Sequence, residues 1–179
     1  TIDTIRELLT LSPNLTRIHA VEPDRRNFRK LSDFASDLPD TLRLSLHHCA
    51  AWDREEELLF DDSGNRNSGL DENGTSKRHA EVAATSVDII ADGRVDYIKY
   101  DVEGAEEQAL LGSAETIKAY HPDLLVSVYH RTEDLFKLIL LINKICPEYN
   151  FYLRRYPYIP AWDLNLIATA RKIASFFIL

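Results

Sequence analysis

The segment YIKYDVEGAE, residues 97–106, carries the clearest sign of how this chain folds. An apolar run ends in two carboxylates, Asp101 and Glu103, and a glycine and a helix-forming stretch follow them. In an open α/β sheet, ligands bind in the crevice beyond the carboxyl ends of the strands. Acidic groups at a strand end are therefore candidate ligand contacts, whereas the same groups inside a strand would be costly to bury. The segment predicts both a sheet and a site at its edge.

Helical and strand-like patterns alternate on both sides of this segment. We expect helices at residues 2–9, after an Asp24 cap, at 105–120 with a kink at Gly112, and at 133–145. We expect strands at residues 16–21, 42–49, 57–60, 82–87, 95–100, 124–129, 151–156 and 165–169.

The order of these elements predicts an α/β fold with a doubly wound, mostly parallel sheet. Strands that are separated by helices run parallel, and the helices cover both faces of the sheet. The last two strands have no helix between them, only a turn that contains Pro157 and Pro160. We therefore expect the sheet to end in a C-terminal antiparallel strand pair.

The composition is that of a globular protein with one domain. The chain has 179 residues, 45% of them hydrophobic, and a formal net charge of −8. An acidic chain is a poor nucleic-acid binder, because binding requires neutralisation of phosphates. No apolar run reaches the roughly 18 residues of a membrane span, and no signal peptide is recognisable. We expect a cytoplasmic protein with no membrane or nucleic-acid partner, and the sequence does not indicate its oligomeric state.

The chain contains two cysteines, Cys49 and Cys146, which lie far apart in the sequence. A chain of this size needs no disulfide, so we expect both to be reduced and structural. No Cys/His spacing typical of a zinc site is present.

Glu22 follows the first strand pattern and is the first candidate cofactor contact. In nucleoside-binding doubly wound folds, an acidic residue at this point accepts hydrogen bonds from the ribose hydroxyls. The alternative is an exposed loop acid. A glycine-rich loop should precede Glu22 by one strand and half a helix, which places it before Thr1. We therefore expect residues 1–179 to form one domain without its N-terminal strand and glycine-rich cofactor loop.

Asp101, Glu103 and His130 are the candidate catalytic groups. Two carboxylates beyond one strand can bind a cation, hold a divalent metal or act as a general base. His130 follows the next strand pattern and can act as a base near neutral pH or as a metal ligand. The structural alternatives are that Asp101 accepts backbone N–H groups, that Glu103 caps the following helix, and that His130 bonds to loop backbone. Lys99 is either a substrate contact or a charge that pairs at the sheet face.

Several further residues are interpreted as follows. Ala51 and Trp52 follow a strand where an adenine pocket would form, although Trp52 is as readily a core residue. Glu106 and Glu107 are interpreted as first-turn partners of a helix dipole. The polar residues 61–80 are interpreted as a solvated loop that contributes to substrate specificity.

Four ordered segments resemble the FkbM family of S-adenosylmethionine-dependent methyltransferases. They are AVEPDRRNF (residues 20–28) with Leu31, VDYIKYDVEGAE (95–106), LLGSA (110–114), and PDLLVSVYH (122–130) with Glu133 and Asp134. The resemblance implies a class I, Rossmann-like methyltransferase fold that binds S-adenosylmethionine, with Glu22 at the ribose and Asp101 at the methyl-transfer end of the site.

The resemblance also implies the reaction, which is O-methylation of a hydroxyl on a small molecule, sugar or natural product. Such an enzyme aligns the acceptor and removes its proton, with Asp101 or His130 as the base. Tyr100 stands where the family has a small or aliphatic residue, and it either narrows the site or packs in the sheet. Two alternatives remain, a nicotinamide-dependent oxidoreductase and a non-catalytic binding protein that keeps the fold.

Overall fold

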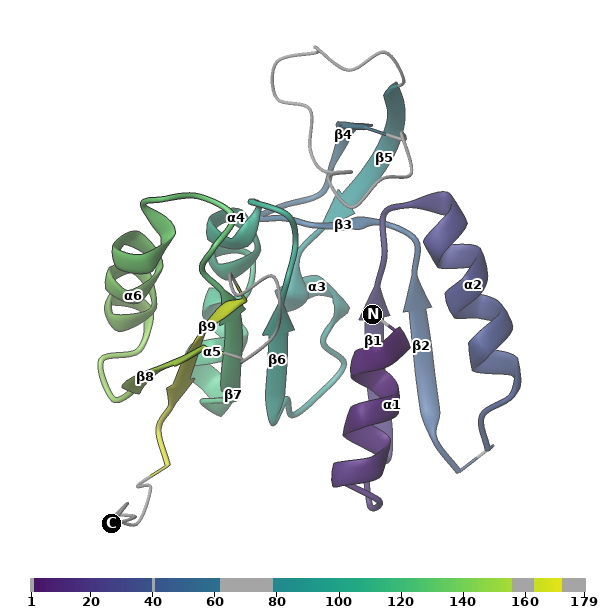
Figure 1. Cartoon of the computed structure of the whole chain (residues 1–179), viewed down its shortest axis with the longest axis horizontal. Coiled ribbons are helices and arrows are strands. Elements are labelled where there is room, and N and C mark those ends of the chain that lie inside the picture. The colour runs from purple at the N-terminus through teal and green to yellow at the C-terminus, as the bar shows by residue number, and fades with distance from the viewer. Residues whose placement is uncertain (1, 40, 62–78, 156–162, 172–179) are drawn as a thin grey trace. The chain divides into compact units, whose positions relative to one another are not determined.

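The computed structural model describes residues 2–39, 41–61, 79–155 and 163–171 (Figure 1). Internal contacts divide the chain into two compact units, Thr1–Thr85 and Ser86–Leu179. Each unit has its own sheets and its own buried residues, and each is described separately below.

The first unit begins with two helices around a pair of parallel strands. The helices are α1 (Ile2–Leu11) and α2 (Arg25–Ser36), and the strands are β1 (Arg17–Val21) and β2 (Arg43–His47). Ile5, Ala20 and Leu31 form the buried centre between these elements. Asp24 begins α2 as predicted, because its Oδ1 accepts the backbone N–H groups of Arg26 and Asn27.

The same unit contains a separate three-stranded sheet. Strand β5 (His79–Thr85) lies between β3 (Ala50–Ala51), to which it is parallel, and β4 (Glu56–Asp61), to which it is antiparallel. The extra strand predicted at residues 57–60 is confirmed as part of β4.

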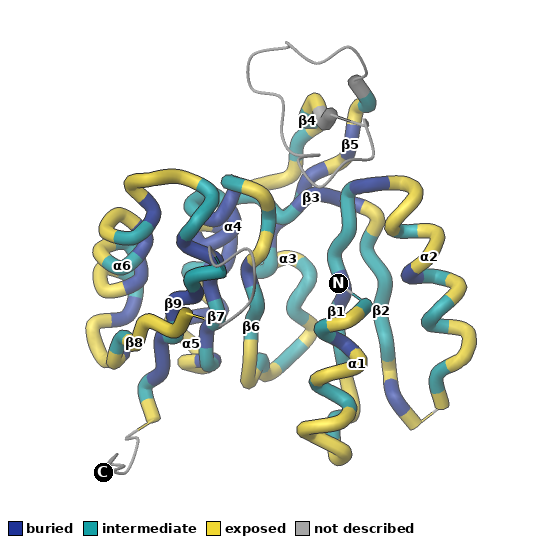
Figure 2. Tube along the Cα trace, in the orientation of Figure 1, coloured by how far each residue is buried: buried dark blue, intermediate teal, exposed yellow. Residues whose placement is uncertain are grey.

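The second unit is built on a four-stranded sheet in the order β6-β7-β9-β8. Its strands are β6 (Tyr97–Tyr100), β7 (Asp123–Ser127), β8 (Asn150–Arg155) and β9 (Leu164–Thr169), and its helices are α3 (Val87–Ile90), α4 (Glu106–Leu111), α5 (Ala114–Tyr120) and α6 (Asp134–Ile145). Figure 2 shows that β7 and β9 are the most buried strands and that α6 turns one side inward. Helix α6 contacts α4, α5 and β9.

The strand pairing confirms the mixed α/β class and the antiparallel finish. Strands β8 and β9 pair antiparallel over six residues each, as predicted for the last two strands. The described strands form three sheets, however, and each sheet contains one parallel pairing while all the other pairings are antiparallel. A single doubly wound sheet therefore stays a prediction. The Pro157/Pro160 turn lies outside the described residues.

Gly112 interrupts the helix predicted at residues 105–120, as expected, but the interruption separates two helices and is not a kink within one. Helix α4 ends at Leu111, where the Gly112 N–H donates to the carbonyl of Gln108. Asp88 then accepts the N–H groups of Glu115 and Thr116 in the first turn of α5. Asp88 thus caps the start of α5, whereas a continuous helix would carry a glycine in its middle, at a cost of about 1 kcal/mol relative to alanine.

Two smaller expectations are also settled, for Tyr100 and for the two cysteines. Tyr100 is buried and packs within the second unit. Cys49 and Cys146 are both buried free thiols, as predicted. Among the described residues, no helix is both long and apolar enough to cross a membrane.

Candidate active site

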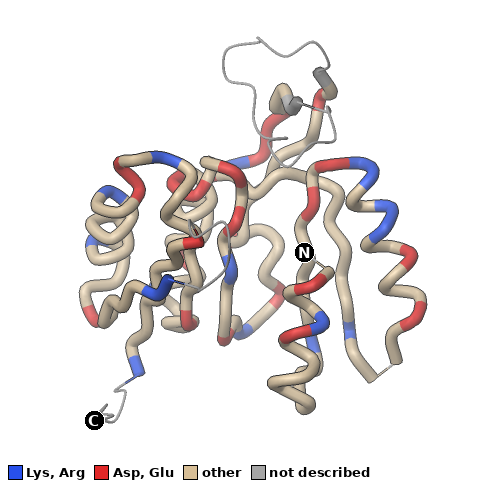
Figure 3. Tube along the Cα trace, in the orientation of Figure 1, with Lys and Arg blue, Asp and Glu red and all other residues tan. Residues whose placement is uncertain are grey.

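The candidate site of the second unit lies where β6 and β7 end. These strands are parallel and paired in register from Tyr97 with Asp123 to Tyr100 with Val126. Their carboxyl ends therefore open at the same edge of the sheet. The segment after β6 supplies Asp101, Glu103 and Glu106, and the segment after β7 supplies Tyr129 and His130. Figure 3 shows the acidic residues gathered on the segment between β6 and α4.

Asp101 is surrounded by donors. Its Oδ1 accepts hydrogen bonds from the hydroxyls of Ser127 at 3.0 Å and Tyr129 at 3.2 Å. Its Oδ2 lies 3.4 Å from the Lys99 ammonium, which reaches the same side of β6 from two residues earlier. Lys99 therefore pairs with the candidate catalytic carboxylate. Within the described residues the hydrogen bonds to Asp101 come from side-chain hydroxyls and not from backbone N–H groups.

His130 is held by Glu106. Its Nδ1 lies 2.7 Å from Glu106 Oε1, which also accepts the backbone N–H of Val102 at 3.0 Å. Because an ionised carboxylate only accepts hydrogen bonds, we place the proton of the neutral imidazole on Nδ1. Nε2 then carries the lone pair.

The Nε2 atom of His130 faces the two carboxylates that the sequence singled out. It lies 3.4 Å from Glu103 Oε2 and 3.7 Å from Asp101 Oδ1. Within the described residues, this buried nitrogen has no hydrogen-bond partner. A basic nitrogen is thus presented to a site lined by carboxylates.

A tight turn brings Glu103 to this position. Glu103 has φ 53° and Gly104 has φ 95°, so the chain passes through two left-handed residues in succession. Glycine accepts this conformation readily, whereas a residue with a side chain is strained by about 1–2 kcal/mol. Glu103 does not cap α4, which begins at Glu106 after an Ala105 cap that makes no side-chain hydrogen bond. The structural alternative in which Glu103 caps the helix is therefore wrong, and the strain is retained where the carboxylate meets His130.

The charges around the site move the pKa values in opposite directions. Burial by itself lowers the pKa of His130, but the hydrogen bond and charge of Glu106, with Glu103 and Asp101, outweigh burial and raise it. Burial by itself raises the pKa of Asp101, but Lys99, the Ser127 hydrogen bond and His130 outweigh burial and lower it. Burial and the neighbouring carboxylates raise the pKa of Glu103. Asp101 is therefore the weaker base and His130 the stronger one.

Sequence reasoning missed Glu106. It was assigned to the helix dipole, yet its side chain is 1% exposed and bonds to His130 and Val102. Glu107, its neighbour, is half-buried and pairs with Lys137 on α6, which fits a role in packing the two helices together. The spacing along α4 could have distinguished Glu106 from Glu107. Glu106 lies three and four residues before Ala109 and Leu110, so it shares their buried face of the helix.

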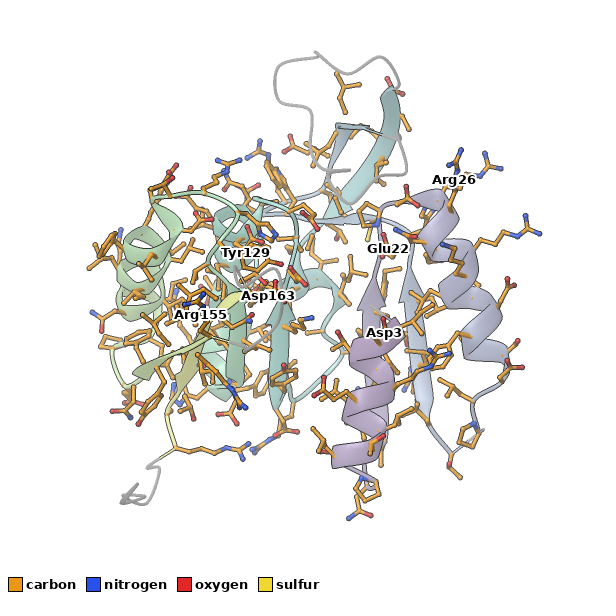
Figure 4. All side chains as sticks on the ribbon, in the orientation of Figure 1. Asp3, Glu22, Arg26, Tyr129, Arg155 and Asp163 are labelled. Atoms are coloured by element: carbon orange, nitrogen blue, oxygen red, sulfur yellow. The ribbon has the colours of Figure 1, made fainter. Side chains whose placement is uncertain are left out.

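Sequence reasoning also missed Tyr129. It follows β7, donates to Asp101, and has its pKa raised by burial and by that carboxylate. Figure 4 labels Tyr129 together with Asp163, which precedes β9. Because β7 and β9 pair antiparallel from Ser127 with Asn165, the two residues lie at the same end of that pair.

The first unit holds the expected cofactor residues. Glu22 lies just beyond β1, where its backbone N–H donates to the carbonyl of His47 and its Oε1 accepts the N–H of Asp24 at 3.1 Å (Figure 4). Ala51 ends β3, and Trp52 packs against Ala50, Val82 and Ala84 with its indole Nε1 buried and making no hydrogen bond to the described residues. Trp52 therefore packs against a small apolar core, which is one of the two interpretations that the sequence allowed.

Comparison with known proteins identifies the fold and the family. A family profile described as "Methyltransferase FkbM domain" matches residues 3–158. The chain belongs to the FkbM methyltransferase family. The match includes residues of both units of this FkbM domain, and it confirms the resemblance seen in the four sequence segments.

A solved structure is similar to this FkbM domain. It is the crystal structure of methyltransferase FkbM from Methylobacillus flagellatus KT, with a TM-score of 0.75 and 26% sequence identity. The alignment covers 93% of this chain and 40% of the other, so the FkbM domain described here spans less than half the length of that protein. A search of curated proteins found no match.

Proposed function

We propose that this FkbM domain transfers a methyl group from S-adenosylmethionine to a hydroxyl of a small molecule, sugar or natural product. The observation that carries the proposal is the His130–Glu106 pair, whose imidazole Nε2 faces Asp101 and Glu103. The similarity to a solved FkbM methyltransferase also supports a class I, doubly wound arrangement around this site.

His130 is the general base of the proposal. S-adenosylmethionine, when bound, supplies an electrophilic methyl group on a positively charged sulfur. A neutral hydroxyl is a weak nucleophile, and its proton must leave as the oxygen is methylated. Nε2 of His130 takes that proton, and Glu106 at Nδ1 keeps the ring in the required tautomer and stabilises the imidazolium. This division of roles is the one used by carboxylate–histidine pairs in other enzymes.

Asp101 contributes charge rather than proton transfer. Its lowered pKa keeps it ionised at neutral pH, and two hydroxyls together with Lys99 already engage its oxygens. At 3.7 Å from Nε2 it stabilises the imidazolium that forms when His130 takes the proton. We therefore assign Asp101 to electrostatic support and, at the same edge, to contact with the cationic part of the cofactor.

Glu22, Ala51 and Trp52 are proposed to bind the nucleoside. A carboxylate has two acceptor oxygens and can accept hydrogen bonds from two vicinal ribose hydroxyls, which is the role proposed for Glu22 at the end of β1. The apolar face of Trp52 suits a purine ring, which stacks well on aromatic groups.

A divalent metal at Asp101, Glu103 and Lys99 is not part of the proposal. The Lys99 ammonium lies 3.4 Å from Asp101 Oδ2 and would repel a cation bound at this carboxylate. In the described part of the chain, the residues whose ligand atoms gather closely enough to hold a metal ion are His121, Cys146 and Glu148.

Isothermal titration calorimetry on the full-length protein with S-adenosylmethionine, S-adenosylhomocysteine and NAD tests the proposal. We expect both sulfur cofactors to bind and NAD not to bind. Binding of NAD alone would establish the oxidoreductase alternative, and binding of none would favour a protein that keeps the fold without catalysis. Incubation with radiolabelled S-adenosylmethionine and a panel of sugars and phenols then tests the acceptor class, and label on nitrogen or carbon would overturn O-methylation.

A further inference from the structure

A second cluster of side chains that can bind a metal lies in the second unit, at the amino ends of β7 and β8. His121 precedes β7 and is followed by Pro122, whereas Cys146 and Glu148 precede β8. One ligand atom from each of the three residues lies within 4.8 Å of the other two, and His121 Nδ1 is 3.7 Å from Glu148 Oε2. The cluster joins two turns that are 25 residues apart in sequence, which is why spacing rules for zinc motifs did not reveal it.

The local backbone holds these residues in place. His121 ends α5 in a left-handed conformation, with φ 47°, and its N–H donates to the carbonyl of Ile117. Cys146 ends α6, and its N–H donates to the carbonyl of Ile142. The buried Tyr149 hydroxyl donates to the carbonyl of Pro122 at 2.5 Å, so the turn after α6 is tied directly to the turn after α5.

The carboxyl ends of α5 and α6 both lie at the cluster. A helix C-terminus carries partial negative charge from its unpaired carbonyls, and it favours a cation nearby. His121 is the C-cap of α5 and Cys146 is the C-cap of α6, so two such ends converge on the three side chains. This is a second reason, independent of the ligand atoms, for positive charge to be favoured here.

We propose that His121, Cys146 and Glu148 bind one divalent ion of the zinc class. A thiolate, an imidazole and a carboxylate form a mixed sulfur, nitrogen and oxygen set that suits Zn²⁺ far better than Mg²⁺ or Ca²⁺. The thiolate and carboxylate charges balance those of the ion. Three protein ligands leave the fourth tetrahedral position to water.

The geometry needs an adjustment of side-chain positions. In a tetrahedral zinc site two ligand atoms lie roughly 3.4–3.7 Å apart, given Zn–S near 2.3 Å and Zn–N near 2.1 Å. The 3.7 Å between His121 Nδ1 and Glu148 Oε2 already meets this, and separations of up to 4.8 Å in the cluster must shrink by up to about 1 Å. Cys146 is buried and fixed, whereas the side chains of His121 and Glu148 are 39% and 71% exposed and can move.

The place of the cluster indicates a structural role for the ion. The candidate active site follows the carboxyl ends of β6 and β7, whereas this cluster lies before the amino ends of β7 and β8. Strand β7 has five residues and spans about 16 Å. An ion here would fix the two turns that begin the strands without contacting the reacting groups.

Titration of the full-length protein with Co²⁺ tests this site. Cobalt replaces zinc in such sites, and its bond to a thiolate gives a charge-transfer absorption band in the near ultraviolet, which added Zn²⁺ should remove. We expect one such band per chain and a higher thermal midpoint with Zn²⁺. Cys146→Ser should abolish the band, and Glu148→Gln and His121→Asn should weaken binding at least tenfold; Asn is chosen because it tolerates the left-handed conformation.

Cys49→Ser is the matched control, because Cys49 is also a buried free thiol but lies in the other unit. It should keep the band. A band that survives Cys146→Ser, or a wild-type protein that gives none, would overturn the proposal. Because the readout is metal absorption, failure here is distinct from failure of cofactor binding or methyl transfer.

Discussion

Glu106 Oε1 lies 2.7 Å from Nδ1 of His130, and this contact joins the first residue of α4 to the loop after β7. Both side chains are shielded from solvent, with 1% and 10% of their surfaces exposed. A buried carboxylate needs a donor, and a buried imidazole needs an acceptor. Glu106 Oε1 and His130 Nδ1 satisfy each other, so the catalytic proposal and the local folding of this edge depend on the same hydrogen bond.

Glu106→Gln should slow methyl transfer by roughly 10- to 100-fold, because the remaining amide no longer stabilises the imidazolium. The pKa of His130 should fall, since Glu106 is the strongest of the groups that raise it. The acid limb of the rate profile should therefore move to lower pH as the maximum rate drops. The control is Glu107→Gln, which alters a more exposed pair with Lys137. An equal loss of rate in both variants would show that Glu106 has no special role.

Glu22→Ala and Asp101→Asn should separate binding from catalysis. Loss of Glu22 removes a proposed ribose contact, so the dissociation constant of S-adenosylhomocysteine should rise by about tenfold or more, which is 1.4 kcal/mol. Asp101→Asn removes the charge that supports the imidazolium, so the turnover rate should fall more than cofactor affinity. Calorimetry and single-turnover rates measure the two effects. Identical profiles for the two variants would contradict the separate roles.

Stability should depend on pH through His130 and Asp101 with opposite signs. The folded pKa of His130 is raised above 6.5, so its contribution is complete below pH 6.5 and is lost as pH rises through the folded value. The folded pKa of Asp101 is lowered below 3.8, so its contribution is present above pH 3.8 and is lost as pH falls through the folded value. Urea unfolding across this pH range should show both trends, and Glu106→Gln should flatten the trend above pH 6.5.

Gly104→Ala should destabilise the protein by about 1–2 kcal/mol, because alanine is strained at φ 95°. The added Cβ would also lie 3.2 Å from Arg131 Nε, which must move away. Gly112→Ala is the comparison, since its φ of −71° is ordinary for any residue. Thermal unfolding measures both variants. A larger loss at Gly112 would contradict the strain argument.

The sequence predicted the elements well because their signals are local. Asp24 at a helix start and the strand that ends just before Asp101 are each encoded within a few residues. Asp101, Glu103 and His130 were also correctly expected near one another, because parallel strands share an edge. Glu106 could not be identified in this way, since its role depends on the partner that a separate loop brings to it. The three-stranded sheet of β3, β4 and β5 likewise arises from pairing between distant segments.

The position of β9 in the sheet has a consequence for how the second unit folds during translation. Residues 164–169 lie between β7 and β8, so the last described strand in sequence order is interior to the sheet. While a ribosome is still translating residues before 164, β7 has an open edge with buried apolar side chains such as Leu124 and Val126. An open apolar edge is a template for aggregation. The nascent chain should therefore need protection until β9 emerges, and truncation before residue 164 should yield insoluble protein even though all the candidate catalytic residues would be present.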